Sequence, residues 1–219
     1  MKFKEWARSG CVATESAFPL SAAQRAATVR ITSRRTLETV MLLSPDRPLL
    51  PVADARAILA RARDEEEPEV YAGVSLLLLA GLRPREVEEL RVGSYRPVTR
   101  QLDAAALRPR TIRIAPSAAA AVDAYLATQV IDPEDYLLPG MRSTRLVQLV
   151  RRVAAAAGVE AGVHELRRVA VGAVLDDGTP VHHVELYFGM TKTSVRNGLT
   201  VVREGYDVGI ADVLEATFA

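Results

Sequence analysis

The pattern of apolar and polar positions predicts a mainly helical chain from residue 51 onward. In VADARAILARAR, apolar residues recur at helical spacing on one face, which carries Val52, Ala55, Ile58, Leu59 and Ala62. VYAGVSLLLLAGL is almost entirely apolar, so it predicts a buried helix that ends at Gly81. A second helix, PREVEELRV, is expected to start at Pro84, because proline is tolerated in a first turn and Glu86 lies near the positive end of the helix dipole.

One strand-like region, residues 96–116, interrupts the helical pattern. Within it TIRIAP alternates apolar and polar residues, as a half-buried strand does. Further helices are expected in AAAAVDAYLAT, with Ser117 as its cap, and then in RSTRLVQLVRRVAAAAG, VHELRRVAVGAVLDD, PVHHVELYFG and TKTSVRNGLTVVREG. The tail places Ile210, Val213, Leu214 and Phe218 on one apolar stripe.

Charge separates the N-terminal segment from the rest of the chain. Residues 1–47 hold eight Lys/Arg against four Asp/Glu, a net charge of +4, whereas residues 48–219 have a net charge of −3. The proline-rich SPDRPLLP after this segment reads as a linker. We therefore expect a basic arm at 1–47, whose pattern fits a short helix or a strand, followed by one domain at 48–219.

Composition excludes several classes of protein. A hydrophobic content of 49% and a charged content of 25% are typical of soluble globular proteins. The longest apolar run, VSLLLLAGL, is too short to span a bilayer, and no signal peptide is visible, so no membrane partner and a cytoplasmic location are expected. Cys11 is the only cysteine, which excludes an internal disulfide and a cysteine-based metal cluster. His182 and His183 are interpreted as a partly exposed pair on a helix rather than as metal ligands.

The candidate chemistry lies in two short segments, GLRPREVEEL and VHELRR. Arg83 follows a buried helix directly, and His164 and Arg167 share one face at the start of a later helix. The N–H groups and the dipole of a helix N-terminus favour an anion, and an arginine fork grips two phosphate oxygens. These three side chains would suit a phosphodiester. Residues 141–168 are also rich in arginine, which fits either a solvated helix face or a local anion site.

These segments resemble the two motif boxes of the tyrosine recombinases, the phage-integrase family. GLRPREVEEL resembles the first-arginine box, and HELRR, followed by an apolar helix, DDG and LYFG, resembles the His-x-x-Arg box. The resemblance covers roughly residues 48–205. It implies a mainly α fold with a small antiparallel β-sheet (α+β), like the catalytic domain of that family, and DNA cleavage by a tyrosine without metal or cofactor. Arg83, His164 and Arg167 match the phosphate-binding residues, and Glu86 matches an acidic residue that supports them.

The sequence departs from the family at four places. The hairpin lysine is missing, since Ala105 stands near its position, although Arg100 or Arg108 could bring a cation there. Met190 replaces a histidine or tryptophan, and Leu199, which cannot attack phosphorus, falls on the position of the nucleophile. The nearest tyrosine is Tyr206. Residues 1–47 are also too few for the N-terminal DNA-clamping domain of the family.

The expected function is that of a degenerate, catalytically silent recombinase fold that binds double-stranded DNA in a regulatory or accessory role, associated with the nucleoid. Five arginines are candidates for further DNA contacts, namely Arg100, Arg108, Arg142, Arg145 and Arg168. Two alternatives stay open: an active recombinase that uses Tyr206, and a protein-interaction module that has lost DNA binding. The tail at 210–218 could pack on its own domain or on a second copy of the chain.

Overall fold

The computed structural model describes residues 49–106, 109–130, 132–190 and 205–219. The basic arm, Arg108, Leu199 and most of the helix expected in TKTSVRNGLTVVREG lie outside these residues.

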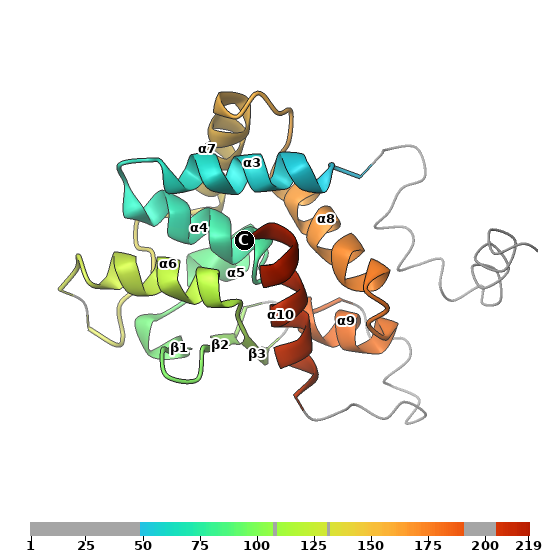
Figure 1. Cartoon of the computed structure of the whole chain (residues 1–219). Coiled ribbons are helices and arrows are strands. Elements are labelled where there is room, and N and C mark those ends of the chain that lie inside the picture. The colour runs from blue at the N-terminus through green and yellow to red at the C-terminus, as the bar shows by residue number, and fades with distance from the viewer. Residues whose placement is uncertain (1–48, 107–108, 131, 191–204) are drawn as a thin grey trace, which may run out of the picture. The chain divides into compact units, whose positions relative to one another are not determined.

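Eight α-helices, one short 3₁₀ turn and three strands make up the described chain (Figure 1). In chain order they are α3 (Val52–Arg63), α4 (Pro68–Leu78), α5 (Pro84–Glu89), η1 (Val92–Ser94), β1 (Tyr95–Arg96), β2 (Gln101–Ala104), β3 (Arg110–Arg113), α6 (Pro116–Leu126), α7 (Ser143–Ala156), α8 (Val163–Asp176), α9 (Val181–Tyr187) and α10 (Tyr206–Phe218).

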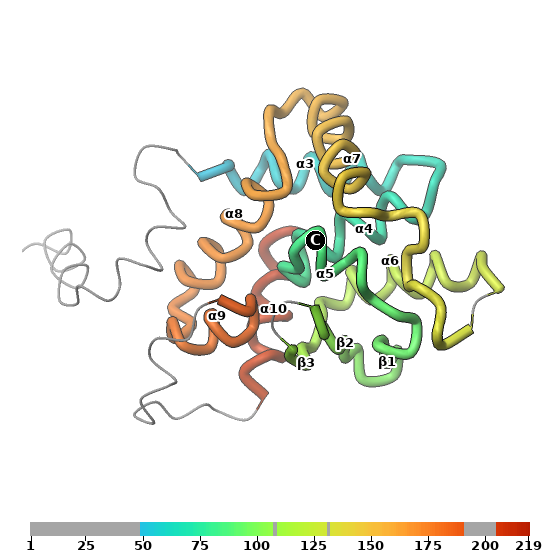
Figure 2. Tube along the Cα trace, turned by 180° about the vertical axis from the view of Figure 1, so that it is seen from behind, coloured from blue at the N-terminus to red at the C-terminus, as the bar shows by residue number. Residues whose placement is uncertain are grey.

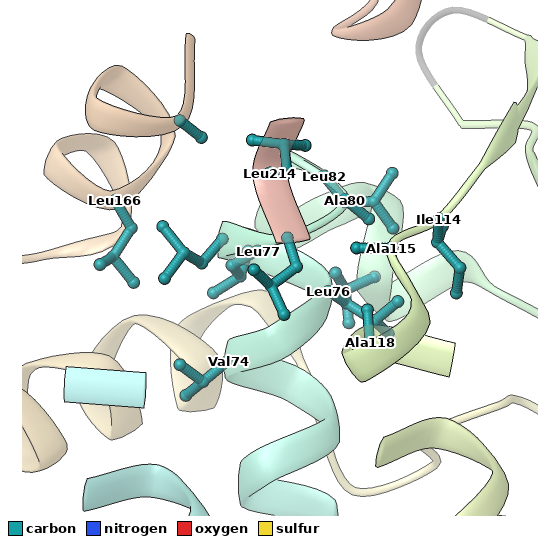
Figure 3. Close-up of a cluster of buried hydrophobic side chains, with 14 of the residues drawn as sticks. Val74, Leu76, Leu77, Ala80, Leu82, Ile114, Ala115, Ala118, Leu166 and Leu214 are labelled. Carbon is teal, nitrogen blue, oxygen red and sulfur yellow. The ribbon is translucent and has the colours of Figure 1, made fainter. Parts of the chain in front are cut away.

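Helix α4 forms the centre of the core, as its apolar sequence predicts. Residues 72–80 are all buried, and α4 contacts α3, α5, α6, α7 and α8. Figure 2 shows the same central position from behind. The apolar side chains of α4 lie in one cluster with Leu166 of α8, Leu214 of α10 and Ala118 of α6 (Figure 3). Because α4 is packed within the core, the start of the loop after its C-terminal end is held in a defined position.

The three strands form an antiparallel sheet in the order β1-β2-β3. Leu102 pairs with Ile112, and both side chains are fully buried, so one face of the sheet packs on the helices. The outer edge of β3 is closed by side chains: Asp207 accepts a hydrogen bond from the Arg113 N–H at 3.0 Å, and the Tyr187 hydroxyl donates to the Arg113 carbonyl at 2.9 Å. Unpaired strand edges invite further pairing, and these two bonds protect the β3 edge at Arg113.

The C-terminal helix α10 packs on its own domain. Ile210, Leu214 and Phe218 are buried against the core and Val213 is partly buried, so the apolar stripe expected in the tail is used within the chain. Polar contacts fix the same helix: Glu215 accepts hydrogen bonds from the Ser117 N–H and hydroxyl, and Arg56 donates to the Thr217 carbonyl. Figure 1 shows α10 running past α9 and β3 toward α3.

The predicted cap of α6 is wrong. The helix starts at Pro116, one residue before Ser117, and its N-cap residue is Ala115. The Ser117 hydroxyl donates to Glu215 at 2.6 Å instead of accepting a backbone N–H at the helix start.

Among the described helices, none is long and apolar enough to cross a membrane.

Candidate anion-binding site

The site begins in the tight loop between α4 and α5. Gly81 adopts a positive φ of 60°, which glycine tolerates without steric cost, and Arg83 follows as the N-cap residue of α5. Glu86, in the first turn, accepts a hydrogen bond from the Arg83 N–H at 2.8 Å. This hydrogen bond therefore fixes the backbone of Arg83 beside a buried carboxylate.

Arg167 reaches the same loop from α8. Its two terminal nitrogens donate to the carbonyls of Gly81 and Phe188. Burial, and after it the positive charge of Arg83, lowers the pKa of Arg167 below its usual range. A desolvated cation with a like charge beside it is stabilised by any anion that approaches, so the pair of arginines favours anion binding.

Three arginines converge on the C-terminal end of α9. Arg110 donates from Nε to the Tyr187 carbonyl at 2.7 Å, Arg167 donates to the Phe188 carbonyl, and Arg83 donates to the Gly189 carbonyl at 3.0 Å. Three successive carbonyls at a helix end are thus each satisfied by a cation, which also complements the negative end of the helix dipole. This turn is the common anchor of the cluster.

Arg110 was not among the residues predicted from the sequence. It pairs with Glu86 in a bidentate ion pair, with distances of 2.6 Å from Nη1 to Oε1 and 3.2 Å from Nη2 to Oε2. The exposed fraction is 8% for the Arg110 side chain and 0% for Glu86. The cluster of Arg83, Arg110, Arg167 and Glu86, hereafter the arginine cluster, therefore carries a formal charge of +2.

A groove of about 920 Å³ opens beside Arg83. Its lining includes three more arginines, Arg85, Arg91 and Arg142, together with Glu88 and Glu89. The Arg91 guanidinium lies over the half-exposed ring of Tyr136, 3.8 Å from the ring centroid. The groove thus extends the positive charge of Arg83 along α5 toward the start of α7.

Comparison with solved structures identifies the fold. The crystal structure of XerA recombinase matches with a TM-score of 0.61 and 19% sequence identity, over 76% of this chain and 64% of that chain. The integrase from mycobacterium phage Brujita matches with a TM-score of 0.60 and 17% identity, over 80% of this chain and 66% of that chain. The fold is that of the tyrosine recombinase catalytic domain. This confirms the predicted fold class, and the chain spans just under two thirds of each of these proteins.

No protein-family model matches the sequence, and the comparison with curated proteins gives no match either. The likeness to the recombinases is therefore a likeness of fold.

Within the recombinase fold, the structure brings Arg83, Arg167 and Glu86 together but not His164. His164 is exposed in the first turn of α8, and none of the described hydrogen bonds involves its side chain. The predicted convergence is thus observed for the two arginines. Arg167 reaches the carbonyls of Gly81 and Phe188, whereas the His164 side chain, three positions earlier in α8, is exposed.

The positions that depart from the recombinase pattern are also placed. Ala105 is exposed directly after β2, and Arg100 lies in the turn before β2 with a positive φ of 53°. Met190 is 5% exposed and belongs to the hydrophobic core. Tyr206 begins α10, half-buried, and burial raises the pKa of its hydroxyl. Its ring stacks on His183 with a centroid distance of 5.2 Å.

The interpretation of the histidine pair needs one correction. His182 is partly exposed, as expected, but His183 is only 5% exposed, because its ring packs on His182 and Tyr206. Within the described ranges, no cluster of three His, Cys, Asp or Glu side chains is arranged to hold a metal ion.

The other predicted DNA contacts differ in their surroundings. Arg142 is exposed at the N-cap of α7 and lines the groove. Arg145 pairs with Glu69 at 2.7 Å, and Arg168 is partly buried in α8. Of these three, Arg142 is placed best for a ligand in the groove.

Proposed function

We propose that this protein binds double-stranded DNA through the arginine cluster and the adjoining groove, and that it does not cleave the strand. The observation that carries the proposal is the charge of the cluster: three arginines converge on one turn, and only one carboxylate, paired with Arg110, offsets their charge in a partly desolvated site. Phosphate is the anion that such a set of planar, fixed donors suits best. A regulatory or accessory role follows from binding without cleavage.

Arg83 is the residue that would contact the phosphate. Its guanidinium has five N–H groups, and in the described part of the chain only Nη2 is engaged, by the Gly189 carbonyl. Arg83 also lines the groove, so the remaining donors have access to a ligand. Arg167 uses both terminal nitrogens on backbone carbonyls and therefore supports the site through its charge and by holding the loop.

Three features support the absence of cleavage. Alanine at 105 supplies no proton to a leaving group, and Met190 supplies no hydrogen-bond donor. Tyr206 has its pKa raised by burial and its ring held against His183, which disfavours the phenolate needed for attack on phosphorus.

The test measures the affinity for a labelled DNA duplex by fluorescence anisotropy at several salt concentrations. Arg83→Ala is expected to weaken binding roughly ten- to hundredfold, the effect of losing charge-assisted hydrogen bonds. Arg63→Ala is the matched control, because Arg63 lies on α3 over the Tyr71 ring and does not line the groove. Equal affinity of the two variants would refute the site, and no binding at moderate salt would favour a protein-interaction module.

A second measurement tests the absence of cleavage. The protein is incubated with fragmented genomic DNA and then denatured in SDS. We expect no SDS-resistant adduct. An adduct that disappears in Tyr206→Phe would show an active recombinase with Tyr206 as nucleophile.

A further inference from the structure

Arg110 reaches the arginine cluster from the sheet. It shares the inward face of β3 with Ile112, two residues away, because side chains alternate along a strand. All three of its guanidinium nitrogens are engaged, one by the Tyr187 carbonyl and two by Glu86. With 8% of its side chain exposed, Arg110 is covered by protein and not available for direct contact with DNA.

The buried Glu86 carboxylate requires a positively charged partner. Its side chain has no exposed area, and Oε2 also accepts the Arg83 N–H. A buried carboxylate without a partner is strongly unfavourable, so Glu86 would draw the nearest available cation if Arg110 were absent. The neighbouring cations are Arg83 and Arg167, and the charge of Glu86 already acts on Arg167.

We propose that Arg110 is a positioning residue of the anion site, which occupies Glu86 so that the charges of Arg83 and Arg167 remain available to a phosphate. This inference rests on the proposed function and adds a determinant of its affinity. Arg110 acts through the charge of its partner: with the ion pair in place, the cluster keeps a net charge of +2 directed at the ligand.

The packing of Arg110 on Gly189 supports the same role. A Cβ atom added at Gly189 would lie 2.7 Å from Nη1 of Arg110, so the guanidinium lies directly against this backbone. Gly189 is the residue whose carbonyl accepts the hydrogen bond of Arg83. Arg110 therefore holds Glu86 by an ion pair and lies against the residue whose carbonyl binds Arg83.

The inference predicts an order of DNA affinities in four proteins of the full chain. Arg110→Met lowers the charge of the cluster to +1 and leaves Glu86 free to draw Arg83, so binding of a labelled duplex is expected to weaken about tenfold, as one charge in a partly buried site gives. Glu86→Gln raises the charge to +3 and is expected to bind several-fold more tightly than the parent. The double variant returns to +2 and is expected to match the parent within about twofold.

The double variant keeps the test decisive if Arg110→Met does not fold. Removing both partners of a buried ion pair is often tolerated, whereas removing one destabilises strongly. A double variant that binds as weakly as Arg83→Ala would show that Arg110 contacts DNA itself and overturn the inference. Equal affinity in all folded variants, with the parent binding DNA, would refute the role of Arg110 alone. A parent protein that binds no DNA would refute the proposed function as well.

Discussion

At the scale of single residues, the shape of the loop at Gly81 decides whether the arginine cluster can form. The Gly81 carbonyl accepts a hydrogen bond from Arg167, and the residue has a positive φ. A Cβ atom added there would lie 2.2 Å from a ring carbon of Phe188, a distance that atoms do not tolerate. Gly81 is thus needed both for its backbone conformation and for the close approach of Phe188.

Replacing Gly81 with alanine separates these two effects when Gly158 serves as the control. Gly158 also has a positive φ, 74°, but an added Cβ would meet nothing within 4 Å. Gly158→Ala is expected to cost about 1–2 kcal/mol in free energy of unfolding, the strain of the left-handed region. Gly81→Ala should cost about 1–3 kcal/mol more, because the ring must be displaced. Urea unfolding measures both, and equal losses would contradict the packing argument.

Local motifs account for what the sequence predicted correctly about individual residues. Arg83 and Glu86 are three positions apart at a helix start, so their geometry follows from the helix alone. The contact between Arg110 and Glu86 depends on the path of the β2–β3 hairpin, which the sequence does not specify. The available signal was the alternation of β3, which places Arg110 on the same face as the buried Ile112.

At the scale of elements, helix α5 caps helix α7. Glu88 of α5 accepts hydrogen bonds from the Ser143 N–H, at 3.1 Å, and from the Ser143 hydroxyl. Arg142, the N-cap residue of α7, has no side-chain acceptor, so a carboxylate from another helix takes that role. The periodicity of the sequence predicted these helices, but the contacts between helices, such as this one and the bond of Ser117 to Glu215, join residues 55 and 98 positions apart.

The cap of α7 should appear as a pH dependence of stability. The hydrogen bonds from the Ser143 hydroxyl and N–H lower the pKa of Glu88. The folded pKa therefore lies below the unfolded value of about 4.3, so the stabilisation is complete above that value and is lost as the pH falls through the folded pKa. Glu88→Gln is expected to flatten the decline of the melting temperature between roughly pH 5 and pH 3.

Glu89→Gln is the matched control for this prediction. Glu89 bonds to Arg85 within the same helix, at 2.8 Å, and does not reach α7. The melting temperature of the Glu89→Gln variant should therefore change with pH more nearly as that of the parent does. Parallel curves for Glu88→Gln and the parent would show that the cap does not contribute.

At the scale of the whole molecule, the distribution of charge within residues 48–219 should confine DNA binding by this part of the chain to one surface. Residues 48–219 have a net charge of −3, so this part of the chain offers little general attraction to DNA. The groove, by contrast, gathers Arg83, Arg85, Arg91 and Arg142 along one surface, although Arg85 is paired with Glu89. We therefore expect few phosphate contacts, and a logarithmic salt dependence of the binding constant with a slope of about −2 to −4.

The slope can be assigned to individual arginines. Arg142→Ala is expected to reduce it by about one and to weaken binding to all duplex sequences alike, because a phosphate contact carries no sequence information. Arg63→Ala, outside the groove, should leave it unchanged. The measurement is anisotropy titration of two unrelated duplexes between low and moderate salt. An unchanged slope in Arg142→Ala, with the parent binding DNA, would place the DNA on another surface, and a loss confined to one duplex would indicate that Arg142 contacts a base.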